Sequence, residues 1–528
     1  MVRARGLVAL LLGVVACGRS PVAVFTSDGG ADGGADGGGD DGADDGNEGA
    51  DDPCAGGTCS DACAEWAAAP TSAGCSFVLV QHAGVDEELS DALVVTNPHD
   101  ERSATLQLSL VPLGSRSLEA VEPPVVLGPG QTHVFELRPE AMVGDGSQRR
   151  TGGVFQLDSD APVAAYQHAP GSTATGNDSL LLLPVAALGR DHVAHSYPGR
   201  TSLEPFGDPS YFDVIALEDG TVVQWTPLTA VTAGDGASIP DVEPGQTGSV
   251  TLERYDVLRV VASAASLDER DVSGTVIEAD APVAVVSGCR CAQVPAVVPD
   301  LPFAGCDPLL EQLLPLSQWG DAYVAARAPV RGNERHHWRI YAGAPGVTVS
   351  SPSPVPGLPH VFDELGEHLE LEVPTGTSFA LEGDGPFMPV QYLQSAYLPE
   401  FDLSSGTSRG DPSMLQAVPT ARFLTRYVVT TPAGFGLDAV QVVRRVGGAD
   451  VILDGQPLAG WSAIDGTYEL TEQLVGSGTH VLEGAEPFGL VQVGFTEDAP
   501  NAVCTANTGE SVCFSSYAYA GGMALAPG

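Results

Sequence analysis

The stretch that best fits a catalytic motif is Gly406-Thr407-Ser408-Arg409-Gly410, which matches the G-x-S-x-G pattern of a serine nucleophile. That motif places its serine at a sharp turn between a buried strand and a helix. Here it lies in a polar loop, SSGTSRGDPS, and no helical pattern follows. The same loop holds Arg409-Gly410-Asp411, an integrin-type tripeptide, but Asp411 occupies a position that recurs elsewhere in the chain. We therefore predict neither a catalytic serine nor adhesion through this tripeptide.

Two histidine pairs and one cysteine pair are the other candidates for chemistry. His192 and His195 are three residues apart, so in a strand they point to opposite faces, and His336-His337 are adjacent. Cys289-Arg290-Cys291 could be redox-active, but a reactive thiol needs positive neighbours or a helix start, and a single arginine is thin support. The sequence therefore predicts no catalytic residue, no metal ligand and no cofactor.

The first residues resemble a bacterial lipoprotein signal. Arg3 and Arg5 precede an apolar run, 7–16, that is too short to span a bilayer and ends in Val-Val-Ala before Cys17. We predict a signal peptide over 1–16 and a lipid on Cys17, which would make the membrane a partner; an ordinary secretory signal is the alternative. Gly18 follows the lipid site, where an Asp would retain the protein in the inner membrane. The predicted location is therefore the cell envelope, at the outer membrane.

Acidic residues dominate the chain, whose formal net charge is −45. Because phosphate binding needs a basic face, we expect no nucleic-acid partner. Residues 28–52 alternate Gly and Asp, cannot be buried, and repel one another, so the segment 17–52 is predicted to be a disordered tether. An EF-hand calcium loop is the alternative, but its ligands alternate and close with a Glu, whereas Asp28, Asp32, Asp36 and Asp40 recur every four positions.

Nine cysteines follow Cys17, and disulfides are the default in an exported chain. Four of them define a Cys-rich cap, 53–75, for which two disulfides are favoured over a zinc knuckle: Cys54, Cys59, Cys63 and Cys75. In the middle cluster, a Cys291–Cys306 bridge that leaves Cys289 over is the simplest solution. The last two candidates, Cys504 and Cys513, lie near the end of the chain.

The sequence contains an internal repeat. Asp-Ala-Pro-Val-Ala occurs at 160–164 and again at 280–284, with weaker relatives at 384–392 and 486–493. Each copy precedes a second shared block that ends in a proline, at Pro184, Pro315, Pro419 and Pro527. Self-similarity at a fixed period is the signature of a repeat architecture. We predict four units over residues 76–183, 184–314, 315–418 and 419–528.

Each unit offers six to eight short strands with frequent turn signals, which is typical of an all-β sandwich. We therefore predict four tandem β-sandwich-like repeats; a four-bladed propeller-like ring is the alternative, since it is also fourfold repetitive. Within each repeat we expect Ser-Asp-Ala-Pro to form a turn, with Val163 starting the next strand, because Pro cannot donate a ladder hydrogen bond. A short helix is predicted over 307–318.

The second unit resembles the N-terminal domain family of IgG-Fc-binding proteins. The resemblance rests on a PVAV-S-G strand followed by Cys, Cys-Asp, Gln-Leu-Pro and Trp-Gly. It covers roughly residues 76–430, departs from the family at Cys289 and Leu314, and implies an extracellular β module that binds a ligand. The family-signature residues are Pro282, Gly288, Asp307, Gln312, Pro315, Trp319 and Gly320.

Three functions remain in view. The first is a tethered lipoprotein that binds or adheres to an unidentified extracellular protein or glycan, and it agrees with the anchor, the tether and the resemblance. The second is a passive spacer in the envelope, which would not bind a saturable partner. The third is an exported hydrolase, which would require a cleft with perturbed titratable groups. We favour the binding protein, which is not an enzyme.

Overall fold

The computed structural model describes the following residues, all within one unit of the chain, Asp52–Gly528: 61–66, 68–82, 90–138, 146–169, 177–199, 209–234, 238–263, 270–297, 305–396, 410–432, 435–496 and 515–526. The predicted signal peptide, Cys17 and the acidic tether lie outside them, as do four disulfide candidates: Cys54, Cys59, Cys504 and Cys513. In this described part, no helix has the length and apolarity needed to cross a membrane.

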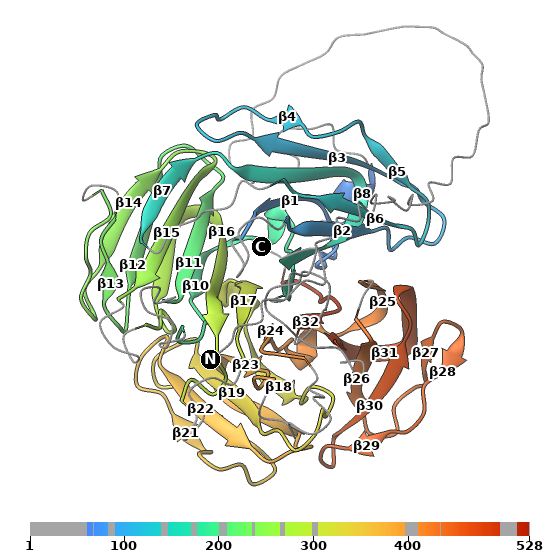
Figure 1. Cartoon of the computed structure of the whole chain (residues 1–528). Coiled ribbons are helices and arrows are strands. Elements are labelled where there is room, and N and C mark those ends of the chain that lie inside the picture. Colours follow the sequence, from blue (N-terminus) through green and yellow to red (C-terminus); the bar gives the residue numbers. More distant parts are fainter. Residues whose placement is uncertain are drawn as a thin grey trace, which may run out of the picture. The chain divides into compact units, whose positions relative to one another are not determined.

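Four antiparallel sheets follow one another along the chain (Figure 1). Sheet one contains β1 (Gly74–Val80), β2 (Ala92–Thr96), β3 (Ala104–Val111), β4 (Glu119–Ala120), β5 (Val125–Leu127), β6 (Thr132–Glu136), β8 (Val154–Ala169) and β9 (Asp178–Leu181). Sheet two contains β7 (Gln148–Thr151), β10 (Gly189–Val193), β11 (Tyr211–Ala216), β12 (Thr221–Thr226), β13 (Val231–Thr232), β14 (Gly248–Leu252), β15 (Asp256–Ala262), β16 (Val276–Ala292) and β17 (Asp307–Gln312). β7 precedes β8 in the chain but pairs with β15, so a strand of the first repeat extends the second sheet.

The two later sheets repeat the plan. Sheet three contains β18 (Gly320–Ala325), β19 (His336–Ala342), β20 (Thr348–Ser350), β21 (His360–Val361), β22 (His368–Val373), β23 (Phe379–Tyr392) and β24 (Met414–Gln416). Sheet four contains β25 (Leu424–Thr431), β26 (Leu437–Arg445), β27 (Val451–Leu453), β28 (Gln456–Pro457), β29 (Ser462–Ala463), β30 (Tyr468–Val475), β31 (Gly478–Phe495) and β32 (Ser516–Ala520). The helices are α1 (Asp61–Trp66) and the 3₁₀ turns η1 (Val185–Ala187), η3 (Leu316–Gln318) and η4 (Thr420–Arg422). The predicted all-β class with four repeats is confirmed.

Each sheet is organised around one long strand, β8, β16, β23 or β31. At the same point in each, four residues lie opposite a single residue of the first strand of the repeat, and the register shifts there. A bulge bends its strand, so β8 pairs with β1 and β3 before this point and with β2 and β9 after it. The four bulge segments are Ser-Asp-Ala-Pro (159–162), Ala-Asp-Ala-Pro (279–282), Gly-Asp-Gly-Pro (383–386) and Gly-Ala-Glu-Pro (484–487).

The recurring Asp-Ala-Pro-Val-Ala motif is thus the bulge of a continuous strand, and the prediction of a turn that separates two strands is wrong. Proline is accepted because the bulge leaves residues without a ladder partner. The acidic residue secures the neighbouring strand: Asp160 accepts the backbone N–H of Thr105 on β3 at 2.6 Å, and Asp280 accepts that of Val222 on β12 at 2.8 Å. The recurring contact holds this strand against the bend of the long strand.

The predicted helix over 307–318 is also wrong for most of its length. Residues 307–312 form β17, paired with β16, and only 316–318 make a 3₁₀ turn. All six residues of β17 are buried. A short apolar run does not distinguish a buried strand from a buried helix by its period, and pairing with the long strand decides it here.

The inner strands join the repeats. β9 contacts β17 and β32, and β24 contacts the same two strands, which makes a closed circuit. Residues 68–82 and 515–526 complete the seam between repeats one and four: Ser72 N donates to Met523 O, and Leu525 N donates to Pro70 O, both at 2.8 Å. The circuit has the connectivity of the ring-like alternative.

Each repeat also retains a sandwich-like core, because both halves of its bent strand contribute apolar side chains to it. In sheet one, Phe155 lies before the bulge and Val163 after it, and both belong to one buried cluster with Val95 and Leu106. Sheets two and four have comparable clusters of their own, and a further cluster extends across the repeats.

Candidate functional site

The structure gives the inner-strand aspartates a structural role. The Asp178 carboxylate accepts hydrogen bonds from Ser413 Oγ at 2.6 Å and from the backbone N–H groups of Leu310 at 2.9 Å and Met414 at 3.3 Å. These donors belong to the inner segments of repeats two and three. Burial raises the pKa of this carboxyl, and the hydrogen bonds oppose that shift. The aspartate therefore fastens three repeats together.

Asp411 is the corresponding residue of repeat three. It is 3% exposed, and its Oδ1 accepts the backbone N–H of Ala396 at 2.9 Å. The carboxylate of the integrin-type tripeptide is therefore buried in the protein. The four residues before Gly410 in the G-x-S-x-G stretch lie outside the described residues. Among the residues that are described, no group of three His, Cys, Asp or Glu side chains is arranged to hold a metal ion.

The histidines of the first pair are packed in the interior. His192 and His195 are both fully buried, and burial lowers their pKa values to about 3 and about 4. His195 Nε2 lies 2.8 Å from Gln416 Oε1 on β24. His336 and His337 are also buried, and burial lowers their pKa values too. All four rings are neutral at pH 7.

The signature residues Pro315 and Gly320 each take part in a glycine–proline contact that recurs between repeats. A Cβ placed on Gly189 would lie 2.3 Å from Pro315 Cβ, and one placed on Gly320 would lie 2.6 Å from Pro419 Cβ. The same arrangement joins Gly74 to Pro184, the proline at the start of repeat two. In the first three repeats, a glycine at the start of the first strand therefore lets the proline of the next repeat approach its backbone, whereas β25 of repeat four starts at Leu424.

The remaining signature residues also serve the junctions. Gln312 Oε1 accepts the N–H of Leu183 at 2.6 Å, and the indole N–H of Trp319 donates to Leu314 O at 3.0 Å. A Cβ on Gly288 would lie 2.2 Å from Leu309 O on β17. Pro282 ends the second bulge, and Asp307, 1% exposed, begins β17. The family signature therefore encodes contacts both within and between repeats.

A buried polar cluster lies at the junction of sheets two and three. The Arg339 guanidinium lies over the Tyr197 ring at 4.5 Å, and its Nη1 donates to Asp271 Oδ2 at 2.7 Å. Burial opposes ionisation of Asp271, but the charge of Arg339 and the hydrogen bonds from Ser273 and Arg339 together lower the pKa of this carboxyl. Nη1 also donates to Ser196 O and Ser273 Oγ, both at 3.1 Å. The arginine is engaged by protein groups, which is the pattern of a structural junction.

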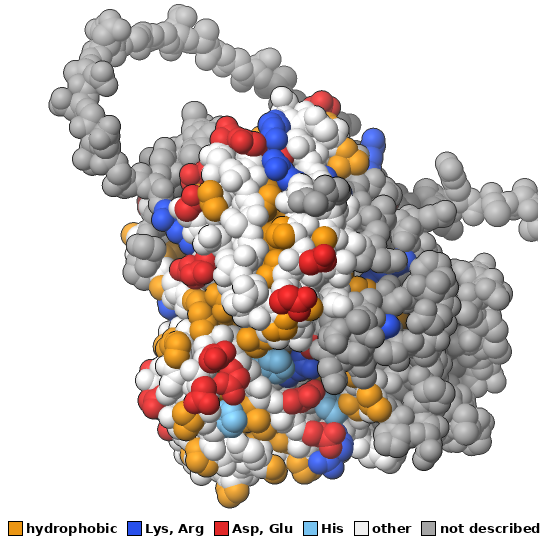
Figure 2. Space-filling model, turned by 90° about the vertical axis from the view of Figure 1, so that its left-hand side faces the viewer, with side chains coloured by type: hydrophobic (Ala, Val, Ile, Leu, Met, Phe, Trp, Pro, Cys, Tyr) orange, Lys and Arg blue, Asp and Glu red, His pale blue; other side chains and the backbone are white. Residues whose placement is uncertain are grey.

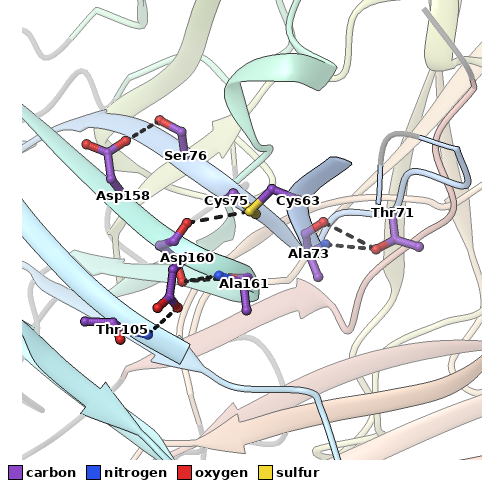
Figure 3. The surroundings of a disulfide bond; sticks show 10 residues. Cys63, Thr71, Ala73, Cys75, Ser76, Thr105, Asp158, Asp160 and Ala161 are labelled. Atoms are coloured by element: carbon purple, nitrogen blue, oxygen red, sulfur yellow. Dashed lines mark hydrogen bonds between the residues drawn. A yellow bond between two sulfur atoms is a disulfide. The ribbon is translucent and has the colours of Figure 1, made fainter. Parts of the chain in front are cut away.

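Two disulfides form among the candidate cysteines, one of them the predicted Cys291–Cys306 bridge. Cys291 and Cys306 form a disulfide beside β17, and buried Cys289 takes no part in it. Cys63 and Cys75 form a second disulfide, shown in Figure 3. Cys75 is the residue that lies opposite the first bulge, and Cys63 lies on α1. The second bridge therefore fixes α1 against the bend of β8.

A groove of about 930 Å³ opens beside this disulfide. One wall is α1 with the turn after it, another is the connection between β2 and β3, and Pro162 of the bulge forms the floor between them. The groove is lined by Ala62, Glu65, Trp66, Thr71, Ala73, Pro98, His99, Asp100, Glu101, Arg102 and Pro162. Its volume lies within the range of small-ligand sites.

The β2–β3 wall is held in place from behind. Asn97 Nδ2 donates to Arg102 O at 2.8 Å, and Asn97 Oδ1 accepts the His99 N–H at 3.0 Å. Arg426 of sheet four donates to Pro98 O and pairs with Asp100 at 2.5 Å. The wall is therefore anchored across the seam between repeats one and four.

The groove presents several kinds of polar group. Glu65 and Arg102, 73% and 48% exposed, face each other at 3.9 Å. Burial and the Arg102 charge lower the pKa of His99, so the ring is neutral. The His99 Nε2 and the indole Nε1 of Trp66 are buried and have no hydrogen-bond partner among the described residues. The polar groups that the groove exposes to a ligand are the carboxylates of Glu65 and Glu101 and the guanidinium of Arg102.

On the face seen in Figure 2, acidic and apolar side chains are interspersed and basic ones are few and scattered. This distribution agrees with the net charge of −45. It lacks the concentrated basic patch that a phosphate-rich ligand would need.

Comparison with known proteins gives one family. A sequence model of the IgGFc binding protein family matches residues 178–494, more than half of the chain. The chain belongs to the IgGFc binding protein family. The human IgGFc-binding protein is 25% identical over 327 residues, which are 60% of this chain but only 5% of the human protein. This chain therefore spans a small part of that relative.

The family predicted from the signature residues is confirmed, and the match extends past residue 430 into β31. The groove is not part of this family match, because every residue that lines it lies before the matched region. Sequence reasoning identified Cys63 and Cys75 but not the groove. Its lining residues come from three separate segments, and no motif marks Pro98–Arg102.

Proposed function

We propose that this member of the IgGFc binding protein family is a surface-tethered binding protein. In this proposal a lipid on Cys17 and the acidic tether hold the β module outside the cell, where the module binds an extracellular protein or glycan. The observation that carries the proposal is the family match over residues 178–494, since the family is one of binding proteins rather than enzymes. The disulfides suit an oxidising compartment.

Binding is tested with full-length protein made in an oxidising compartment. The first probe is immobilised Fc of IgG, because the human relative carries that name, with the Fab fragment as control. The second set of probes is an array of extracellular proteins and oligosaccharides. We expect saturable binding to at least one probe, competed by excess unlabelled ligand. Failure to retain any probe would contradict the proposal.

Tethering is tested separately. Metabolic labelling with a radioactive fatty acid should mark the native protein, and Cys17→Ser should abolish the label and release the protein from the outer membrane. If the variant remains in the membrane fraction, the lipid anchor is wrong whatever the module binds.

A passive spacer is the second candidate, and one observation favours it. The signature residues Gln312, Pro315, Trp319 and Gly320 all serve contacts within and between repeats, so the family signature does not itself define a ligand site. A spacer predicts that no probe binds saturably and that shortening the acidic tether alone changes function. Saturable binding at one site would decide for the binding protein.

A further inference from the structure

We infer that the groove between α1 and the β2–β3 connection binds a neutral saccharide. This inference rests on the proposed binding function and names a ligand class and a site for it. The site is distinct from the family signature, because its residues all precede the matched segment.

The walls are fixed before a ligand arrives. The Cys63–Cys75 disulfide fastens α1 to β1, and Cys63 Sγ lies 3.7 Å from Ser159 O in the bulge (Figure 3). On the other side, Asn97 and Arg426 hold the β2–β3 wall. A preorganised site loses less conformational entropy on binding, so rigid walls suit a small ligand that gains modest energy from each contact.

The polar groups match hydroxyls. A sugar hydroxyl both donates and accepts, and the groove supplies acceptors in Glu65 and Glu101 and a donor in Arg102. This combination suits a polyhydroxylated ligand.

The indole supplies the apolar component. Trp66 is partly exposed and lines the groove, whereas Trp225, Trp319 and Trp338 are buried. An aromatic ring offers a large flat apolar face with a polar edge. The C–H face of a pyranose ring can stack on it while the hydroxyls reach the carboxylates.

The charges of the groove favour a neutral ligand. A basic peptide would have to separate Glu65 from Arg102 and Asp100 from Arg426, whereas a neutral ligand can hydrogen-bond to the groove with both pairs intact. An acidic saccharide would meet the remaining Glu101 carboxylate in a molecule of net charge −45. A neutral saccharide avoids both penalties.

The experiment uses tryptophan fluorescence. In Trp461→Phe, Trp66 is the only partly exposed tryptophan of the chain's five. The full-length variant is solubilised in a detergent without a sugar headgroup. It is titrated with neutral gluco-, galacto- and manno-oligosaccharides, with sialylated counterparts, and with an oligo-arginine peptide. Acrylamide quenching then measures access to the groove.

We expect a neutral oligosaccharide to bind saturably and to protect Trp66 from quenching. Trp66→Ala should weaken binding roughly tenfold or more, the loss expected of a central aromatic contact. Glu101→Gln leaves the helix untouched and should weaken binding severalfold, whereas Glu119→Gln, on the exposed strand β4 of the same sheet, should not.

Other outcomes separate the two proposals. Tighter binding of the sialylated sugars, or protection by oligo-arginine alone, would overturn the saccharide class. If an extracellular protein such as Fc binds saturably while no sugar protects Trp66, the groove assignment fails and the binding function stands. If no probe binds anywhere, both fail.

Discussion

Gly189→Ala tests whether the glycine–proline contact sets the spacing of the repeats. The new Cβ would lie 2.3 Å from Pro315 Cβ and 3.0 Å from its Cγ. Carbon atoms in contact sit about 3.5–4.0 Å apart, so the two backbones must separate by about 1.2 Å or more. Pro315 is buried and its ring is rigid, so the strain cannot be relieved by a rotamer change. Overpacking of this kind costs about 1–3 kcal/mol.

The assay is thermal unfolding, in which 1 kcal/mol lowers Tm by about 2–4 °C for a domain of some 150–250 residues. Gly466→Ala is the matched control, because a Cβ there meets no atom within 4 Å. Pro315→Gly removes the opposing carbons, so the double variant Gly189→Ala/Pro315→Gly should be no less stable than Pro315→Gly alone. If Gly189→Ala melts with the control, or if its cost persists unchanged in the double variant, the contact does not set the spacing.

Three further predictions follow from buried groups. Asp178→Asn puts an amide where a carboxyl oxygen accepts hydrogen bonds from other segments, so urea denaturation should show a loss of about 1–3 kcal/mol. Burial raises the pKa of Asp91 to about 7. Between about pH 4 and pH 7 the folded state therefore holds a proton on Asp91 that the unfolded state has lost. The free energy of unfolding should fall across this range by up to about 1.4 kcal/mol per pH unit. Asp91→Asn should remove this component, and an identical pH profile would contradict the assignment. Replacing both Cys63 and Cys75 by Ser should cost about 3 kcal/mol and expose α1 to proteolysis, whereas removing the other disulfide should leave α1 protected.

Much of the architecture could be predicted because the repeat is local in sequence. Equivalent residues of the repeats, such as Asp160 and Asp280, make the same contact with the strand beside the long strand. Four occurrences of one pattern therefore predict four similar sheets. The Cys291–Cys306 pairing could also be predicted, because the middle cluster holds only three cysteines and one of them must be left over.

Other features depend on tertiary contacts. Ser-Asp-Ala-Pro satisfies the local preferences of a turn, yet β8 continues through it because strands on both sides pair with the long strand. Residues 307–312 are apolar enough for either helix or strand, and pairing with β16 decides between them. The groove could not be predicted from the sequence, because its walls are brought together by a disulfide and by Arg426, which is more than 300 residues from the β2–β3 connection.

The groove lies where the fourfold repetition is broken. In all four repeats a bulge of four residues faces one residue of the first strand, but that residue is Cys75 in repeat one and Arg190, Asp321 or Thr425 in the others. Only a cysteine at this position can fasten a helix over the bend. The elements that the family shares build the repeats and their junctions, whereas α1 and its bridge belong to this chain's segment before the match. A binding surface made by such an addition can change its ligand without disturbing the junctions, so substitutions at the exposed residues Glu65 or Glu101 should alter binding while leaving Tm within about 2 °C of the parent.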